Sequence, residues 1–397
     1  MKSIIFRSAL IVAALLAAAH QAPALVNLTK YTFPTSTSQN AYLTGNFNLS
    51  GTNADSTQTG YNLSAVANYD LFYRSLPFSY NFDVVGNIVS AKAVTQGAKS
   101  QDAYDVRATT RGNRYFSNDK DYFGFGAATF EYRKQLGVDT TDDPYADVSA
   151  GVGYGRTIDA TVLKQAWRMQ EDWKRFGVIK GDLSDDQLIA LARIIDRKGE
   201  FQSKYGPVEY RKYWYEAMEQ VVRDANVLTG PNLGAMGIIR IQEVLDEPTG
   251  RRITGWEARL GGGVVLHNFN GKKGDPFASA ELDWSKPLSI DLQLNDNFYS
   301  RAVFATDMSY LVGDYFQVYY EITNRIDWDN SVRAEFNIPT ATGAKTDVSG
   351  NFTSAFLFYL ENRLTFGPSF VVNYHDNGVD KALTNWSLLG SITYRLR

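Results

Sequence analysis

From residue 41 onward, most of the chain alternates apolar and polar residues with a period of two. Phe78, Tyr80 and Phe82, for example, alternate with Ser79 and Asn81. Successive side chains of a β-strand point to opposite faces, so this pattern predicts strands with one apolar face. The pattern is found in fifteen segments: 41–50, 60–73, 78–88, 102–112, 121–132, 145–156, 255–266, 277–284, 287–295, 300–311, 315–325, 331–338, 351–361, 364–374 and 385–397.

These segments favour a membrane barrel over a soluble sheet. They are longer than the usual strand of about five or six residues, and aromatic residues gather near their ends. The predicted turns alternate between short (74–77, 285–287, 361–363) and long (91–101, 134–144, 339–350, 375–384). We therefore expect an all-β transmembrane antiparallel barrel of about 14–16 strands, since single-chain bacterial barrels have even strand numbers. Region 277–325 allows two pairings, and a secreted β-sandwich or solenoid is the alternative.

Residues 158–250 lack the alternation and predict an inserted α-helical subdomain. Leu188, Leu191, Ile194 and Ile195 recur at helical spacing. The predicted boundaries are an N-cap at Asp159, a stop at Gly177, a Ser184–Gln187 capping box with a Leu183–Leu188 staple, a helix start at Pro207, and a fourth segment over 236–245 before Pro248.

The predicted helices carry one apolar stripe and many charges. Tyr210, Trp214 and Met218 form an aromatic and apolar stripe that we expect to be core. The charges are mixed in sign, which is typical of a solvated face; they are Lys164, Arg168, Glu171, Asp172, Lys174, Arg175, Asp185 and Asp186. Six strand segments precede the subdomain, so a chain that starts in the periplasm would return there before entering it.

The N-terminus predicts export. Lys2 and Arg7 flank an apolar run that ends before Ala22-Pro23-Ala24, the pattern of a secretory signal peptide over 1–24. The predicted organisation is then 25–157 and 251–397 as the two parts of the barrel, with 158–250 between them. The chain has no cysteine, so disulfides and thiolate metal sites are excluded. Its formal charge is −3, which argues against nucleic acid as a partner.

The signal pattern, the alternating segments and the last segment, NWSLLGSITYRLR (385–397), together resemble a bacterial outer-membrane β-barrel of the porin-like class. The resemblance covers about 41–157 and 251–397. Proteins of this class often end in an aromatic residue, whereas here Tyr394 is close to the end and the chain finishes with Arg397. The resemblance implies a Gram-negative outer membrane, contact with its lipid and no cofactor.

Charged residues on the polar face are the candidates for lining a lumen and biasing which solutes pass. They are Asp105, Arg107, Glu257, Arg259, Asp291, Glu321, Arg333 and Glu335. We expect a channel, porin or export conduit for small hydrophilic solutes or a linear polymer. Residues 158–250 would gate it or dock a periplasmic protein. The alternative is a structural or partner-binding barrel that does not conduct, and cross-lumen salt bridges are an equally good interpretation of each charge.

An enzyme is the weakest of the hypotheses. A membrane-embedded hydrolase would need a histidine beside a nucleophile or acid. Outside the predicted signal only His267 and His375 are present, and the adjacent Asp376 points to the opposite face of a strand from His375. No nucleophile elbow and no metal-ligand cluster is found in the sequence. The glycines of GVGYG (151–155) predict close packing at the barrel wall.

Overall fold

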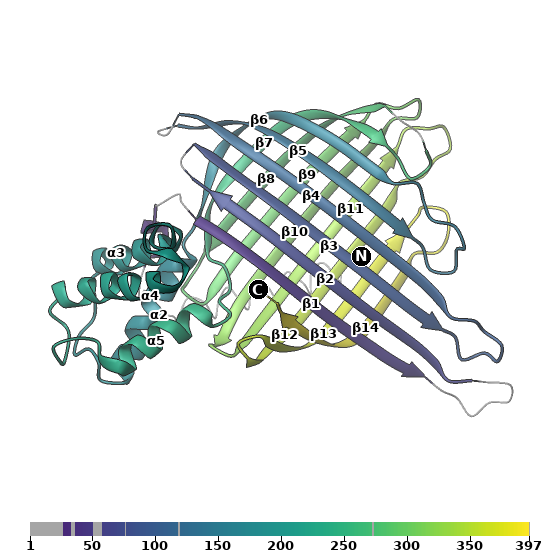
Figure 1. Cartoon of the computed structure of the whole chain (residues 1–397). Coiled ribbons are helices and arrows are strands. Elements are labelled where there is room, and N and C mark those ends of the chain that lie inside the picture. The colour runs from purple at the N-terminus through teal and green to yellow at the C-terminus, as the bar shows by residue number, and fades with distance from the viewer. Residues whose placement is uncertain are drawn as a thin grey trace.

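The computed structural model describes residues 27–32, 36–50, 58–75, 77–117, 120–271 and 274–396. Fourteen antiparallel strands follow one another in chain order, and β1 pairs with β14 to close a barrel (Figure 1). The strands are β1 (Ser36–Ser50), β2 (Gly60–Arg74), β3 (Phe78–Lys92), β4 (Gln101–Ser117), β5 (Lys120–Lys134), β6 (Tyr145–Asp159), β7 (Ile253–His267), β8 (Asp275–Pro287), β9 (Leu292–Val303), β10 (Ser309–Thr323), β11 (Ile326–Pro339), β12 (Asp347–Glu361), β13 (Leu364–Asp376) and β14 (Leu383–Arg395).

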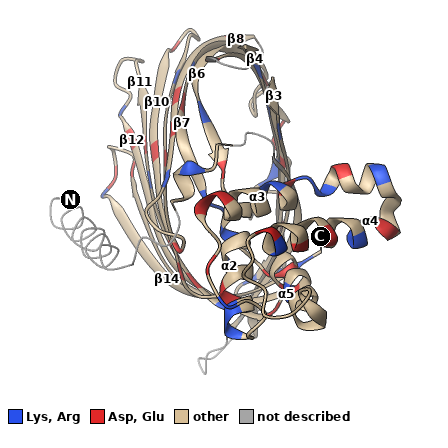
Figure 2. Cartoon of the chain, turned by 90° about the vertical axis from the view of Figure 1, so that its left-hand side faces the viewer, with Lys and Arg blue, Asp and Glu red and all other residues tan. Residues whose placement is uncertain are grey.

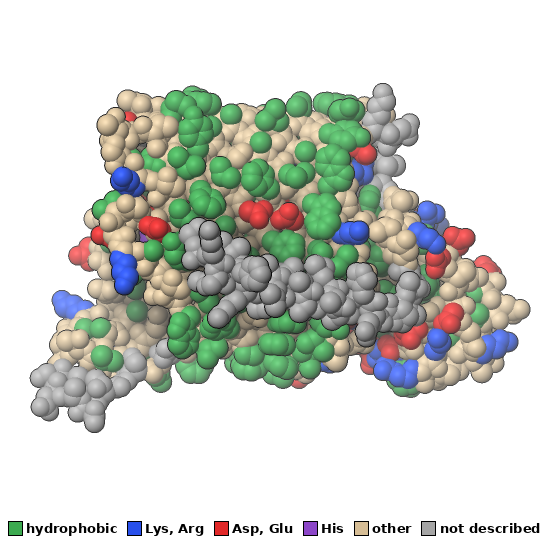
Figure 3. Space-filling model, turned by 180° about the vertical axis from the view of Figure 1, so that it is seen from behind, with side chains coloured by type: hydrophobic (Ala, Val, Ile, Leu, Met, Phe, Trp, Pro, Cys, Tyr) green, Lys and Arg blue, Asp and Glu red, His purple; other side chains and the backbone are tan. Residues whose placement is uncertain are grey.

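Because apolar and polar residues alternate along the strands, apolar side chains lie on the outer face of the barrel and polar side chains on the inner face. Its outer face carries large exposed apolar side chains such as Ile88, Leu260 and Leu388, and hydrophobic residues cover much of it (Figure 3). Closure leaves no free sheet edge, which a membrane-spanning sheet requires because lipid cannot pair backbone groups. The predicted transmembrane barrel is confirmed, and the β-sandwich alternative is wrong.

The count of fifteen segments is wrong by one. Segments 287–295, 300–311 and 315–325 correspond to two strands, β9 and β10, and residues 285–287 belong to β8 instead of a turn. The cause is a polar interruption of the outer face. Asp296 lies opposite Phe316 in the ladder, and Asp314 lies opposite Phe298, so two acidic residues stand where the alternation predicts apolar ones.

The two ends of the barrel differ in the length of their connections. At one end, two to four residues separate β2 from β3, β4 from β5, β8 from β9, β10 from β11 and β12 from β13. At the other end, five to ten residues separate consecutive strands. The helices between β6 and β7 extend from the short-turn end. The chain enters β1 and leaves β14 at this end too, where Arg395 donates to the carbonyl of Asp246.

Four helices form the insertion: α2 (Thr161–Arg175), α3 (Asp185–Asp196), α4 (Lys198–Asp224) and α5 (Gly234–Asp246). The capping box of α3 is confirmed, because Ser184 Oγ accepts from the Gln187 amide and Gln187 Oε1 accepts from the Ser184 amide. Gly177 adopts a φ of 68° just after α2 and ends it as predicted.

One predicted helix start is wrong, and the helix predicted to begin at Pro207 is preceded by a helical stretch that was not predicted. The N-cap of α2 is Ala160, although Asp159 still accepts hydrogen bonds from the amide and hydroxyl of Thr161. α4 begins at Lys198, nine residues before Pro207, and is interrupted at Gly206 with φ 78° and ψ 167°. Pro207 therefore opens only the second half of α4, because a proline cannot continue the helix that precedes it.

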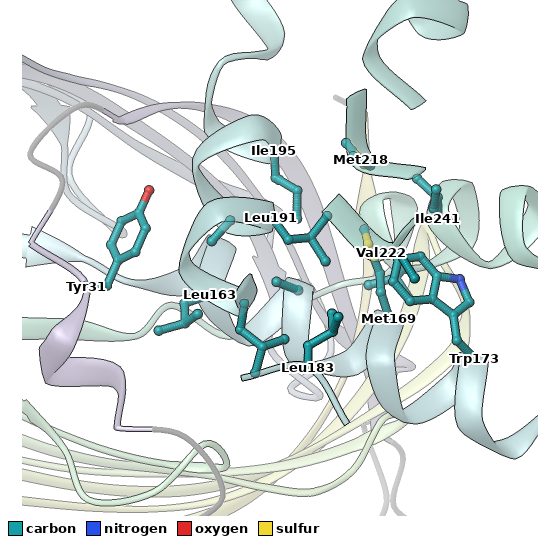
Figure 4. Packing of buried hydrophobic residues seen from close by; sticks show 14 of the residues in the cluster. Tyr31, Leu163, Met169, Trp173, Leu183, Leu191, Ile195, Met218, Val222 and Ile241 are labelled. Atoms are coloured by element: carbon teal, nitrogen blue, oxygen red, sulfur yellow. The ribbon is translucent and has the colours of Figure 1, made fainter. Parts of the chain in front are cut away.

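The helices share one hydrophobic core, here called the helical block core. Trp173, Leu191, Met218 and Ile241 from the four helices are almost fully buried in it (Figure 4). Tyr31 joins them from the segment after a short 3-10 turn, η1 (Leu28–Lys30), which precedes β1. The aromatic stripe of α4 is thus core, as predicted, since Tyr210 and Trp214 are also buried there.

The predicted signal peptide lies outside the described residues. Within those that are described, no helix is both long enough and apolar enough to cross a bilayer.

Candidate functional site: the lumen and its helical floor

The interior of the barrel holds a cavity of about 1050 Å³ at the short-turn end. Strand residues line its sides, including Asp70, Arg111 and Tyr319. Val162 and Gln165 of α2 and Leu245 of α5 line it too, and the helices lie across this mouth of the barrel (Figure 2). The helical block therefore forms part of the floor of the lumen.

A buried carboxylate of the barrel wall holds this floor. Glu321 of β10 accepts from the ammonium of Lys164 and from the guanidinium of Arg168, both on α2. Arg252, which leads into β7, brings its Nη2 to 3.6 Å from Glu321 Oε2. All four side chains are at most 5% exposed. Such a cluster is costly to break, because removing one partner leaves other charges buried without compensation.

Burial lowers the pKa of two cations beside Glu321, which are Arg252 before β7 and Lys164 on α2. It lowers the pKa of Arg252 to about 10, so this guanidinium stays charged at neutral pH. Burial, together with the neighbouring Arg252 and Arg168, lowers the pKa of Lys164 well below its ordinary range.

Further contacts fasten the block at its edges. Arg252 Nε donates to the carbonyl of Ile290 in the β8–β9 turn at 2.6 Å, and Ile290 itself packs in the helical block core. Lys30 pairs with Asp185 of α3 at 2.6 Å on the surface. α2 also begins two residues after the end of β6, so it has little freedom to swing away.

The prediction of a solvated charged face is wrong for three residues of α2. Lys164, Arg168 and Asp172 are at most 4% exposed. Lys164 and Arg168 face Glu321, and Asp172 accepts from Arg240 of α5. The sequence interpretation failed because Glu321 lies more than 150 residues away along the chain.

Of the eight candidate lumen residues, Glu257 and Arg259 lie in a dense ion network on the inner face of β7. Arg259 pairs with Glu257 and with Asp283 of β8. Arg111 of β4 makes a bidentate pair with Glu281 of β8, with Nη2–Oε2 at 2.7 Å. Glu257 is only 2% exposed.

Four more candidates lie on the inner face nearer the long-loop end. Asp105 and Arg107 alternate with the outward Val106 and share a face with Arg111. Arg333 and Glu335 alternate with the outward Phe336, and Glu335 accepts from the Tyr299 hydroxyl at 2.5 Å. These four are separate from the ion network around Glu257.

The last two candidates lie away from the centre of the lumen. Asp291 belongs to the β8–β9 turn, where its backbone carbonyl accepts from the Glu321 amide. Glu321 is covered by the helical block, as described above. Asp291 therefore lies outside the strands, whereas Glu321 lies on the inner face of β10 as the alternation predicted, with the helical block covering it.

On the inner face of β5–β8, aromatic rings pack directly against glycines of the neighbouring strands. A Cβ at Gly153 would lie 2.3 Å from the ring of Phe123, and one at Gly263 would lie 2.4 Å from the ring of Phe277. Gly151 likewise has no room for a side chain beside Phe125. The glycines of GVGYG thus serve close packing, as predicted, whereas the rings that fill the space were not identified from the sequence.

The histidines do not form a catalytic arrangement in the described part of the chain. His375 Nδ1 lies 3.4 Å from Asp347 Oδ1 at the long-loop end, and both are about half exposed. Asp376 instead accepts from Tyr374 on the other face of β13. Among the described residues, no hydroxyl hydrogen-bonds to His375 or to His267, whose Nδ1 contacts the carbonyl of Pro144.

No protein-family model matches the chain, and no curated protein matches it. Solved structures similar to it include the outer-membrane channel DcaP of Acinetobacter baumannii, at 8% identity over 91% of this chain and 98% of that one, with a TM-score of 0.37. A bacterial polysaccharide outer membrane secretin is 7% identical over 90% and 98%, with a TM-score of 0.33. OprB of Pseudomonas putida is 9% identical over 91% and 94%, with a TM-score of 0.32.

The class follows from the architecture itself: a closed antiparallel barrel with an even strand number, an apolar outer band, a polar lumen and short turns at one end. The chain is a bacterial outer-membrane β-barrel with four helices inserted between its sixth and seventh strands.

Proposed function

We propose that this barrel is a channel for hydrophilic solutes, and that the helical block restricts its inner, periplasmic mouth. The observation that carries the proposal is a polar cavity inside a closed barrel, with helical residues in its floor. An eight-stranded barrel is filled by side chains, whereas fourteen strands can enclose water. Short turns mark the periplasmic end of such barrels, and the helical block extends from that end.

The charges of the cavity support passage of solutes without a strong preference for one sign. Its lining includes eight acidic and seven basic residues, and one of the acidic ones, Asp296, belongs to the outer-facing set. The remaining seven acidic and seven basic residues balance. A neutral lining gives no large electrostatic barrier to neutral or weakly charged solutes.

The test is osmotic swelling of liposomes that contain the purified protein. With a neutral trisaccharide outside, we expect measurable swelling for the unchanged chain and faster swelling for Glu321→Gln, because the floor loses its buried anchor. Asp185→Asn is the matched control, since it removes only the surface pair with Lys30 and should leave the rate unchanged. Equal rates for Glu321→Gln and the unchanged chain would contradict restriction by the block.

A second candidate is a barrel that binds a periplasmic protein through residues 158–250 without conducting. It is favoured by exposed apolar side chains at the free side of the block: Phe176, Met236 and Ile239 are each nearly half exposed. No swelling for either the unchanged chain or Glu321→Gln would leave this candidate as the better account.

A further inference from the structure

Inside the barrel, side chains of strands that are not neighbours in the sheet form ion pairs and hydrogen bonds with one another. β4 and β8 are separated in the sheet by β5, β6 and β7. The guanidinium of Arg111 nevertheless donates to both carboxylate oxygens of Glu281, at 3.2 and 2.7 Å. Arg74 of β2 reaches β6 and β7, where its Nη2 donates to Thr157 Oγ1 at 2.8 Å and lies 3.6 Å from Glu257 Oε1.

These residues form one connected set, here called the inner partition. Arg259 links its two halves, because it pairs with Glu257 and lies 3.7 Å from Glu281 Oε2, and it also pairs with Asp283. Nearer the long loops, Arg301 of β9 forms a similar ion pair with Asp147 of β6, at 2.8 Å. The inner partition consists of Arg74, Arg111, Glu257, Arg259, Glu281 and Asp283.

The space behind the inner partition is filled. Phe123, Phe125 and Phe277 lie against glycines of β6 and β7 so closely that a Cβ at Gly153, Gly261 or Gly263 would come within 2.7 Å of a ring. Interiors packed in this way leave no path for water or solute. The cavity lies on the other side of the partition, where Arg74, Arg259 and Asp283 line it together with residues of β1, β3 and β14.

We infer that the inner partition, and not the circumference of fourteen strands, sets the size limit and the charge selectivity of the pore. This inference rests on the proposed channel function. The partition holds three arginines and three carboxylates and is neutral as a whole. Arg74, Arg111, Glu257, Arg259 and Asp283 line the cavity. Loss of Glu281 therefore leaves Arg111 without its bidentate partner beside the lumen, and loss of Arg111 does the same to Glu281.

Planar-bilayer recordings test the inference in two ways. Arg111→Ala should admit larger poly(ethylene glycol) chains than the unchanged protein admits, and its reversal potential in a salt gradient should shift toward cation selectivity. Glu281→Ala should also widen the pore but shift the reversal potential toward anion selectivity. The double exchange Arg111→Glu with Glu281→Arg should return both quantities toward their original values.

Arg133→Ala is the control for size, because Arg133 pairs with Asp142 and Glu131 outside the partition and should not change the polymer cutoff. An unchanged cutoff and an unchanged reversal potential in both Arg111→Ala and Glu281→Ala would overturn the inference. A retained heat-dependent shift in gel mobility verifies that each variant is folded.

A second measurement does not depend on conductance, so it separates this inference from the proposed function. The chain has no cysteine, and one can be placed behind the partition at Ser149 of β6 or on the opposite inner wall at Thr353 of β12. A bulky poly(ethylene glycol) maleimide should label Thr353→Cys and not Ser149→Cys. Equal labelling would overturn the partition, whereas a silent bilayer with unequal labelling would overturn only the channel.

Discussion

At the scale of single residues, the inner wall is built from glycines that accept aromatic rings. Gly153 lies under Phe123, and Gly263 lies under Phe277. Each ring packs on the backbone of the adjacent strand, because Phe123 faces Gly153 and Phe277 faces Gly263 in the ladder. The composition of 32 glycines alone gives no hint of this, because a glycine that faces lipid looks identical in sequence.

Gly153→Ala tests this packing. Its Cβ would lie 2.3 Å from the Phe123 ring and 2.7 Å from the Ala258 carbonyl, so we expect a loss of about 1–3 kcal/mol in the free energy of unfolding, as for other overpacked sites. Gly86→Ala is the matched control, because no atom lies within 4 Å of the added Cβ. Urea unfolding in detergent or lipid gives both values, and equal stability of the two variants would contradict the packing role.

At the scale of elements, the sequence predicted what depends on neighbours along the chain. Alternation located the strands, and the capping box at Ser184 located the start of α3. What depends on distant residues could not be predicted. Lys164 and Arg168 look like a solvated face until Glu321 of β10 is placed beside them, and Arg111 finds Glu281 only through closure of the barrel. The boundaries of β9 and β10 were likewise predicted wrongly, because Asp296 and Asp314 interrupt the apolar alternation of their outer faces.

The anchor between α2 and β10 gives a prediction for stability. Glu321→Gln should lower the free energy of unfolding by about 3–5 kcal/mol, because Lys164 and Arg168 would remain buried without their carboxylate. Limited proteolysis should then cut the helical block before the barrel strands. Asp185→Asn, which removes a surface pair, should show neither effect. A Glu321→Gln chain as stable and as resistant as the unchanged one would mean that the cluster contributes little.

At the scale of the whole molecule, the barrel, the partition and the floor act on the same lumen. The fourteen strands enclose it, the cross-lumen pairs and the rings behind them occupy one side of it, and the helical block lies across its short-turn mouth. On the proposed function, we expect a narrow channel with a restricted inner entrance and a conductance well below what its strand number alone would suggest.

The most direct test of this account is the single-channel conductance of the unchanged protein in a planar bilayer. We predict discrete current steps in salt solution that are smaller than those of the Arg111→Ala variant. A complete absence of current steps, with protein that is shown to be folded and inserted in the membrane, would contradict the central claim that this barrel conducts.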